Sequence, residues 1–80
     1  MEAKRACILG IGAYSPERVL TNHDLEQMVY TTDAWILERT GISERHIAAD
    51  DEASSDLATQ AGRRALTDAG IAPDEIDLVI

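Results

Sequence analysis

The chain carries an apolar segment near each end, and this pair of segments limits the folds that it can adopt. Residues 6–14 are almost continuously apolar and are followed by Ser15, Pro16 and Glu17. Residues 77–80 begin a second apolar run, with no turn after it. Runs of this kind are typical of strands that are buried on both faces of a parallel sheet. The sequence therefore predicts an α/β fold in which helices lie between two parallel strands.

The amount of apolar material is small for such a fold. The chain has 80 residues, of which 45% are hydrophobic, but twelve of the hydrophobic residues are alanine and none is phenylalanine. A parallel sheet also needs helices on both of its faces, and residues 1–80 do not supply them. We therefore expect the 80 residues to be the amino-terminal part of a longer protein. Expressed alone, they should expose unpaired apolar segments and aggregate.

Charge and cysteine content exclude several functional classes. Fifteen acidic side chains against seven basic ones give a net charge of −8, which argues against nucleic acid and anionic membranes as partners. A single cysteine cannot form an internal disulfide, which fits a cytoplasmic location. No apolar run reaches the roughly 18 to 20 residues that a membrane-spanning helix needs. The first apolar stretch is too short for a secretory signal, so Met1 is interpreted as a genuine start.

Two short helices are predicted in the first half of the chain. Thr21 and Asp24 have the spacing of a capping box, which predicts a helix over residues 22–30. A second helix is predicted over residues 33–40. Its signals are Thr31 or Thr32 as the N-cap, Asp33 in the first turn and Gly41 in a left-handed C-terminal conformation.

The second half of the chain contains the longest predicted helix. Residues 42–49 alternate only weakly, which fits a strand or an extended connector, and the acidic run 50–52 is typical of a solvated loop. Ser54 or Ser55 can cap a helix over residues 55–69, after which a glycine follows, and Pro73 predicts a one-turn helix over residues 74–76. Small residues dominate one stripe of the long helix, so a neighbouring backbone can approach it closely. The stripe consists of Leu57, Ala58, Ala61, Gly62, Ala65, Leu66 and Ala69.

The glycine pair, the cysteine and the two histidines of the chain could each be functional, but a structural role is favoured for each of them. Gly10 and Gly12 begin a dinucleotide-binding pattern, but the third glycine is replaced by serine and a proline follows, so close packing of a buried strand is favoured. Cys7 is expected to be a small buried hydrophobic residue. His23 and His46 lack partners at metal-ligand spacing and are expected to be ordinary surface histidines, so no metal site is predicted. No serine, cysteine or threonine has a recognisable nucleophile context.

One pair of residues indicates a binding surface. Trp35 and Arg39 are four residues apart on the predicted helix 33–40 and therefore share a face. An indole can stack on a purine, and a guanidinium can bind a phosphate, so the pair suits a ligand with a nucleotide tail. In the alternative interpretation Trp35 fills the core and Arg39 pairs with Glu38 or Glu44. From the residues alone, both interpretations stay open.

A long stretch of the chain resembles a known enzyme family. Residues 31–48, TTDAWILERTGISERHIA, resemble the T-[ST]-D-x-W-I-x-x-R-T-G-I-x-x-R-x-I stretch of β-ketoacyl-acyl carrier protein synthase III. Residues 8–22 match the family opening I-x-G-x-G-x-Y-x-P-x-x-x-x-T-N, and residues 55–80 resemble the segment that follows. The resemblance thus extends over nearly the whole chain.

The resemblance implies a thiolase-like fold, layered αβαβα in the full-length family, with residues 1–80 forming the amino-terminal portion of its first α/β half. It implies an acyltransferase that initiates type II fatty-acid synthesis by decarboxylative Claisen condensation of an acyl-CoA with malonyl-acyl carrier protein, giving 3-oxoacyl-acyl carrier protein. Family members are homodimers. They use the coenzyme A thioester as substrate, and no further cofactor is implied. The family's catalytic cysteine, histidine and asparagine lie beyond Ile80, and Cys7 does not match that cysteine.

The resemblance also implies a coenzyme A site. Trp35 matches a tryptophan that stacks on the adenine, Thr31 a threonine near the adenine edge, and Arg39 an arginine near the phosphates. Thr40 is expected at the same entrance. Ser43 stands where members often carry arginine, which implies a weaker phosphate contact or a different acyl primer. Two alternatives remain: a related condensing enzyme that primes polyketide or other secondary-metabolite synthesis, and a non-catalytic acidic interaction module.

Overall fold

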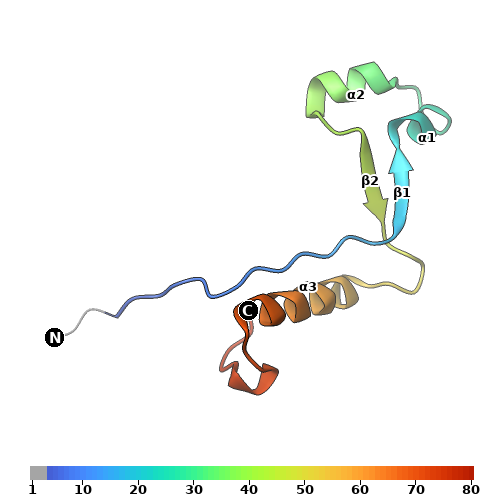
Figure 1. Ribbon diagram of the computed structural model, residues 1–80. Helices are drawn as coiled ribbons and strands as arrows, with labels where there is room; N and C mark the ends of the chain where they lie inside the picture. Colours follow the sequence, from blue (N-terminus) through green and yellow to red (C-terminus); the bar gives the residue numbers. More distant parts are fainter. Residues whose placement is uncertain (1–3) are drawn as a thin grey trace. The chain divides into compact units, whose positions relative to one another are not determined.

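The computed structural model describes residues 4–80, which fall into two compact units. We call the first, Ser15–Ala53, the hairpin unit, and it contains β1, α1, α2 and β2 (Figure 1). We call the second the helical unit. It combines Ser54–Ile80 with residues 4–14 and contains α3 and a short 3-10 helix, η1.

Helix α1, Asn22–Glu26, begins with the predicted capping box. The Thr21 hydroxyl accepts a hydrogen bond from Asp24 N at 3.1 Å, and Asp24 Oδ2 accepts one from Thr21 N at 2.9 Å. The backbone N–H of Thr21, and then its hydroxyl, hold the pKa of the Asp24 carboxyl below its usual value. The predicted end at residue 30 is wrong. Glu26 Oε1 accepts a hydrogen bond from Asp33 N at 2.6 Å, so the chain turns back after Glu26 instead of extending the helix.

Helix α2, Asp33–Thr40, has the predicted bounds. The Thr32 hydroxyl caps it by accepting a hydrogen bond from Trp35 N at 3.1 Å. Gly41 ends it with a φ of 71°, a left-handed conformation that favours glycine, and its N–H donates to Leu37 O at 2.8 Å. The local signals of this helix therefore agree with its structure.

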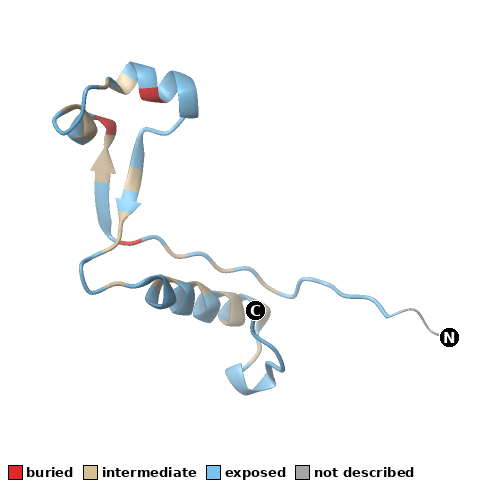
Figure 2. Cartoon of the chain, turned by 180° about the vertical axis from the view of Figure 1, so that it is seen from behind, coloured by how far each residue is buried: buried red, intermediate tan, exposed pale blue. Residues whose placement is uncertain are grey.

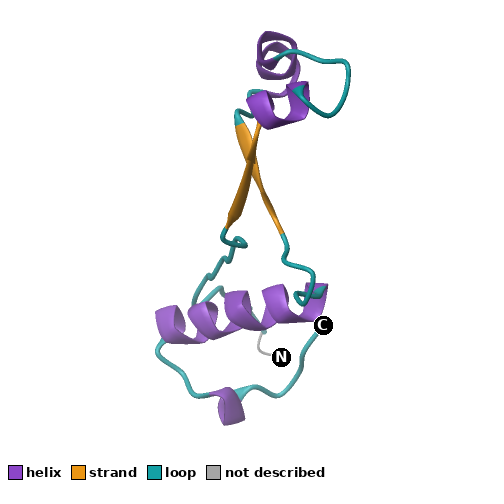
Figure 3. Cartoon of the chain, turned by 90° about the vertical axis from the view of Figure 1, so that its right-hand side faces the viewer, coloured by secondary structure: helices purple, strands orange, loops and turns teal. Residues whose placement is uncertain are grey.

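Two strands form an antiparallel hairpin that carries the two short helices at one end (Figure 3). Strand β1, Arg18–Thr21, pairs with β2, Glu44–Ile47, in a register that places Arg18 opposite Ile47. The strand interpretation of residues 42–49 is confirmed for β2. Strand β1 was not predicted, because four residues between a turn and a helix cap show no periodicity and become a strand only through their partner.

The two strands predicted at residues 6–14 and 77–80 do not form within residues 4–80, and neither does a parallel sheet. A strand requires the backbone of a partner strand. The segment of residues 6–14 instead runs beside a helix, α3, Ser54–Ala69, as Figures 1 and 2 show. Side chains of α3 bind its backbone: Ile11 N donates to Asp68 Oδ2 at 3.0 Å, and Arg64 Nη1 donates to Ala13 O at 2.9 Å. Cys7 is exposed, so the prediction that it is buried is wrong as well.

The close contact with α3 explains the glycine pair. A Cβ on Gly10 would lie 2.6 Å from Ala65 O, and one on Gly12 would lie 2.3 Å from Ala61 O. Both positions therefore require glycine. The predicted close packing is confirmed, but the segment that carries the glycines is neither a strand nor buried. Helix α3 ends as predicted, at a Gly70 with a φ of 70°.

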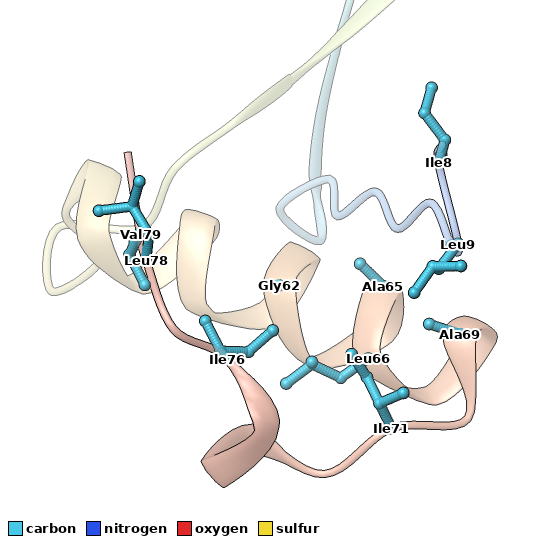
Figure 4. Close-up of a pocket in the computed structure, with 11 residues that line it drawn as sticks. Ile8, Leu9, Gly62, Ala65, Leu66, Ala69, Ile71, Ile76, Leu78 and Val79 are labelled. Carbon is cyan, nitrogen blue, oxygen red and sulfur yellow. The ribbon is translucent and has the colours of Figure 1, made fainter. Parts of the chain in front are cut away.

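The end of the helical unit contains η1, Pro73–Glu75, one residue earlier than predicted. Its Glu75 side chain accepts a hydrogen bond from Ala72 N at 2.6 Å. Beyond η1, an apolar hollow of about 480 Å³ opens against α3. Figure 4 shows the side chains that line it, among them Ile8, Leu9, Leu66, Ile71, Ile76 and Leu78.

Few side chains are buried in the described residues (Figure 2). Among residues 4–80, Ile36 is the only buried hydrophobic side chain apart from Pro16, and Asn22 is the most deeply buried residue, at 1% exposed. The expected scarcity of core is thus confirmed. Across residues 4–80, every helix is too short or too polar to cross a membrane.

Candidate functional site

A shallow hollow lies at the start of α2 in the hairpin unit. It has a volume of about 360 Å³ and is lined by Tyr30, Thr31, Thr32 and Trp35. The turn after α1 brings the first residues of this set to the cap of α2, and the capping hydrogen bond from Trp35 N to Thr32 Oγ1 fixes the backbone beneath the indole. The hollow therefore combines an aromatic wall with two threonine hydroxyls.

Trp35 faces outward. Its side chain is 54% exposed, whereas the next residue, Ile36, is 9% exposed and supplies the buried contact of α2. The interpretation of Trp35 as a core residue is therefore wrong. A helix has one inward-facing stripe, and in α2 Ile36 occupies it.

Arg39 lies against the indole. Its guanidinium carbon is 5.2 Å from the centre of the Trp35 ring, which is within the range of a cation–π contact. Within residues 4–80 the structure describes no ion pair from Arg39 to Glu38 or Glu44. Arg39 is an exposed residue whose guanidinium lies beside the indole ring.

The two threonines predicted at the site lie at opposite ends of α2. Thr31 lines the hollow beside Trp35. Thr40 does not line the hollow; its hydroxyl donates to Ile36 O at 2.8 Å and accepts a hydrogen bond from Ile42 N at 3.0 Å. The structure therefore brings Thr31, Trp35 and Arg39 together, while Thr40 stabilises the end of the helix.

Tyr30 and Thr32 are residues of the hollow that sequence reasoning did not assign. Tyr30 is fully exposed, although an aromatic ring gains free energy from burial. One signal was available in the sequence: both residues flank Thr31 directly. The sequence did not reveal that α1 ends at Glu26. In the predicted helix over residues 22–30, Tyr30 would have been part of the helix and not of the turn before α2.

The remaining titratable candidates do not gather into a site. His23 Nδ1 lies 3.5 Å from Glu26 Oε2, and His46 Nδ1 contacts Pro16 O at 2.5 Å, so each imidazole has a local partner. Both histidines are on the surface, as expected. Across residues 4–80, no three histidine, cysteine, aspartate or glutamate side chains are grouped to hold a metal ion.

The arrangement at α2 can bind a planar, negatively charged ligand. Stacking on an exposed indole contributes about 1 to 3 kcal/mol per base. A guanidinium beside the ring adds charge-assisted hydrogen bonds to phosphate oxygens. Within the hollow the chain offers hydroxyls but no thiol, imidazole or carboxylate.

Comparison with known proteins gives similar sequences and similar solved structures. No protein-family model matches the chain. The β-ketoacyl-[acyl-carrier-protein] synthase III of Hyphomonas neptunium is 60% identical over 77 residues, which cover 96% of this chain and 24% of the relative. The crystal structure of 3-oxoacyl-[acyl-carrier-protein] synthase III from Aquifex aeolicus superposes with a TM-score of 0.82 and 51% identity, over 88% of this chain and 22% of that one.

A third relative belongs to another pathway. The priming β-ketosynthase of the R1128 polyketide pathway superposes with a TM-score of 0.83 and 43% identity, over 88% of this chain and 21% of that chain. These superpositions confirm the expected fold class, an α/β part of a thiolase-like fold. The chain spans about a quarter of the length of the relatives that it matches. By sequence and by structure, it is homologous to a segment of β-ketoacyl-[acyl-carrier-protein] synthase III.

Proposed function

We propose that the chain forms the amino-terminal portion of the first α/β half of a β-ketoacyl-acyl carrier protein synthase III and supplies part of its coenzyme A entrance. The intact enzyme would be a homodimer that condenses an acyl-CoA with malonyl-acyl carrier protein, with loss of carbon dioxide, to give 3-oxoacyl-acyl carrier protein. No residue of this chain is assigned a catalytic role.

The observation that carries this proposal is the exposed Trp35 with Arg39 against its ring, beside a hollow. The adenine of coenzyme A would stack on the indole, and the Thr31 hydroxyl would bind the edge of the base. Arg39 would bind the phosphates, since its guanidinium lies 5.2 Å from the centre of the indole ring on which the base would stack. Thr40 would not contact the coenzyme in this arrangement. Its hydroxyl would stabilise the C-terminal end of α2, next to Arg39.

A direct test is the affinity of the intact protein for coenzyme A, measured by titration calorimetry. Trp35→Ala should weaken binding by about 5- to 160-fold, because loss of base stacking costs about 1 to 3 kcal/mol. Leu37→Ala is a matched control, since Leu37 lies on the same helix, is 40% exposed and is outside the hollow. Equal affinity of the Trp35→Ala variant and the wild type would overturn the proposal.

A second candidate function is the priming of a polyketide. The likeness to the R1128 priming β-ketosynthase favours it, since that superposition is as good as the one with the fatty-acid enzyme. Both candidates require the same nucleotide contact, so Trp35 does not distinguish them. Assay of the intact enzyme with acetyl-CoA and longer acyl-CoA primers, and with carrier proteins of both pathways, separates the two.

A further inference from the structure

A polar network lies beneath α2 in the hairpin unit, with Asn22 at its centre. The Asn22 side-chain amide donates to Asp33 Oδ1 and to Ile42 O, each at 2.8 Å. Its Oδ1 accepts a hydrogen bond from Arg45 Nη2 at 2.7 Å. Its backbone N–H donates to Ser43 O at 3.0 Å. Every polar atom of the side chain is therefore satisfied, at 1% exposure.

These contacts bracket α2. Asp33 is the first residue of the helix, and Ile42 and Ser43 directly follow the glycine that ends it. A single side chain thus holds the chain before Trp35 and the chain after Arg39. Both binding residues are close in sequence to the residues that Asn22 holds: Trp35 comes two residues after Asp33, and Arg39 comes three residues before Ile42.

Two further hydrogen bonds fix the network to its surroundings. Glu26 Oε1 accepts from Asp33 N at 2.6 Å, which ties α1 to the start of α2. Arg45 Nη1 donates to Leu20 O at 3.2 Å, which ties the network to β1. The anchor of α2 is therefore the strand pair itself.

Apolar packing alone does not fix the rotation of α2. Ile36 is its only buried hydrophobic residue within the described chain, and a contact of one side chain allows the helix to turn. Hydrogen bonds are directional, and a satisfied buried amide specifies one arrangement, since any rotation leaves its donors unpaired. The network thus supplies the orientation that the thin core does not.

We propose that Asn22 is a positioning residue for the nucleotide-binding surface formed by Trp35 and Arg39. It acts through Asp33 and Ile42, which hold the two ends of α2, and it does not touch the ligand. This inference rests on the proposed function, because it assumes that the surface binds the nucleotide end of coenzyme A. A small displacement of a binding group is enough to lose much of its contribution.

The test uses Asn22→Asp in the intact protein. This variant has the same shape and keeps an oxygen for Arg45, but it replaces the two amide donations with an oxygen that faces Asp33 Oδ1 and Ile42 O. The measured quantity is the ratio of kcat/KM for acetyl-CoA to kcat/KM for acetyl-pantetheine, which lacks the nucleotide. Loss of folded enzyme lowers both values equally and leaves the ratio unchanged.

We expect the ratio to fall about tenfold in Asn22→Asp, which corresponds to about 1.4 kcal/mol. In a Trp35→Ala background the same substitution should produce a smaller further fall, since the stacking contact is already lost and only the Arg39 contact remains to be displaced. If Asn22→Asp does not fold, Asp33→Ala and Asp33→Asn replace it. Asp33→Asn keeps an acceptor oxygen for the amide, so its ratio should fall less than that of Asp33→Ala.

The outcomes separate the two proposals. A ratio that falls in Trp35→Ala but stays at the wild-type value in Asn22→Asp overturns the positioning role and leaves the binding site intact. Equal losses with both substrates in Asn22→Asp give Asn22 a purely structural role, which also overturns the inference. A ratio that is unchanged in Trp35→Ala refutes the proposed function itself.

Discussion

At the scale of single residues, the hollow depends on side chains whose exposure is costly. Tyr30 is fully exposed and Trp35 is half-exposed, although both rings gain free energy when they leave water. Two aromatic rings at one hollow provide two faces for a planar ligand. We therefore predict that Tyr30 contributes to the proposed binding of a base, as a second aromatic wall beside Trp35 that sequence reasoning did not identify.

Tyr30→Ala should weaken coenzyme A binding by about 2- to 12-fold, the equivalent of an aromatic contact of about 0.5 to 1.5 kcal/mol. Tyr30→Phe should bind as the wild type does, because the ring and not the hydroxyl makes the contact. Calorimetric titration of both variants, with Val29→Ala as an exposed neighbour outside the hollow, measures the effect. If Tyr30→Phe binds as weakly as Tyr30→Ala, stacking is not the cause.

At the scale of elements, α3 is held to the amino-terminal segment by close backbone contact. Gly12 lies so near α3 that an added Cβ would be 2.3 Å from both Ala61 O and Ala65 N. Neither neighbour can move without disturbing the helix, because both atoms are backbone. The alanines of α3 and the two glycines of the amino-terminal segment have small side chains or none, so the two backbones can approach this closely.

Gly12→Ala should lower the free energy of unfolding of the intact protein by about 1 to 3 kcal/mol or more, the cost of overpacking. Gly62→Ala is the matched control on the same helix, since its Cβ would meet nothing within 4 Å. Alanine in a helix interior is favoured over glycine by about 0.5 to 1 kcal/mol, so this variant should be at least as stable as the wild type. Denaturant unfolding measures both, and equal stability of the two variants would contradict the packing argument.

At the scale of the whole molecule, most large apolar side chains of the described residues stay exposed to solvent. Ile8, Leu78 and Val79 are 75 to 85% exposed around the hollow of the helical unit. The segments that carry them belong to no sheet within residues 4–80, which favours the addition of a strand from another molecule. The apolar hollow and the unpaired segments are features of one surface.

Residues 1–80 expressed alone should therefore aggregate at micromolar concentration and show no cooperative thermal transition. Light scattering against concentration, with circular dichroism during heating, measures both properties. A double variant, Ile8→Asp with Val79→Asp, should reduce the scattering, because charge on this surface opposes association. A sharp melt of the unmodified 80 residues, with dispersed amide signals, would contradict the expectation.

The candidate site could be predicted from the sequence only in part. Trp35 and Arg39 were placed on one face by their spacing, and the structure brings them to 5.2 Å. Their exposure was not predictable, since the sequence left open a core role for the indole. The sequence showed Asn22 only as the residue after a helix cap. Its role was not predictable, because its four hydrogen bonds go to residues 11 to 23 positions away in the chain.

The sequence by itself determined the elements whose signals are local. The cap at Thr21, the left-handed Gly41, the bounds of α2 and the end of α3 before Gly70 follow from contacts within a few residues, whereas α3 begins at Ser54, one residue earlier than predicted. Only the tertiary structure decided which extended segments become strands. A strand is defined by its partner strand, so residues 6–14, which have α3 beside them, do not form a strand, while the short β1 pairs with β2.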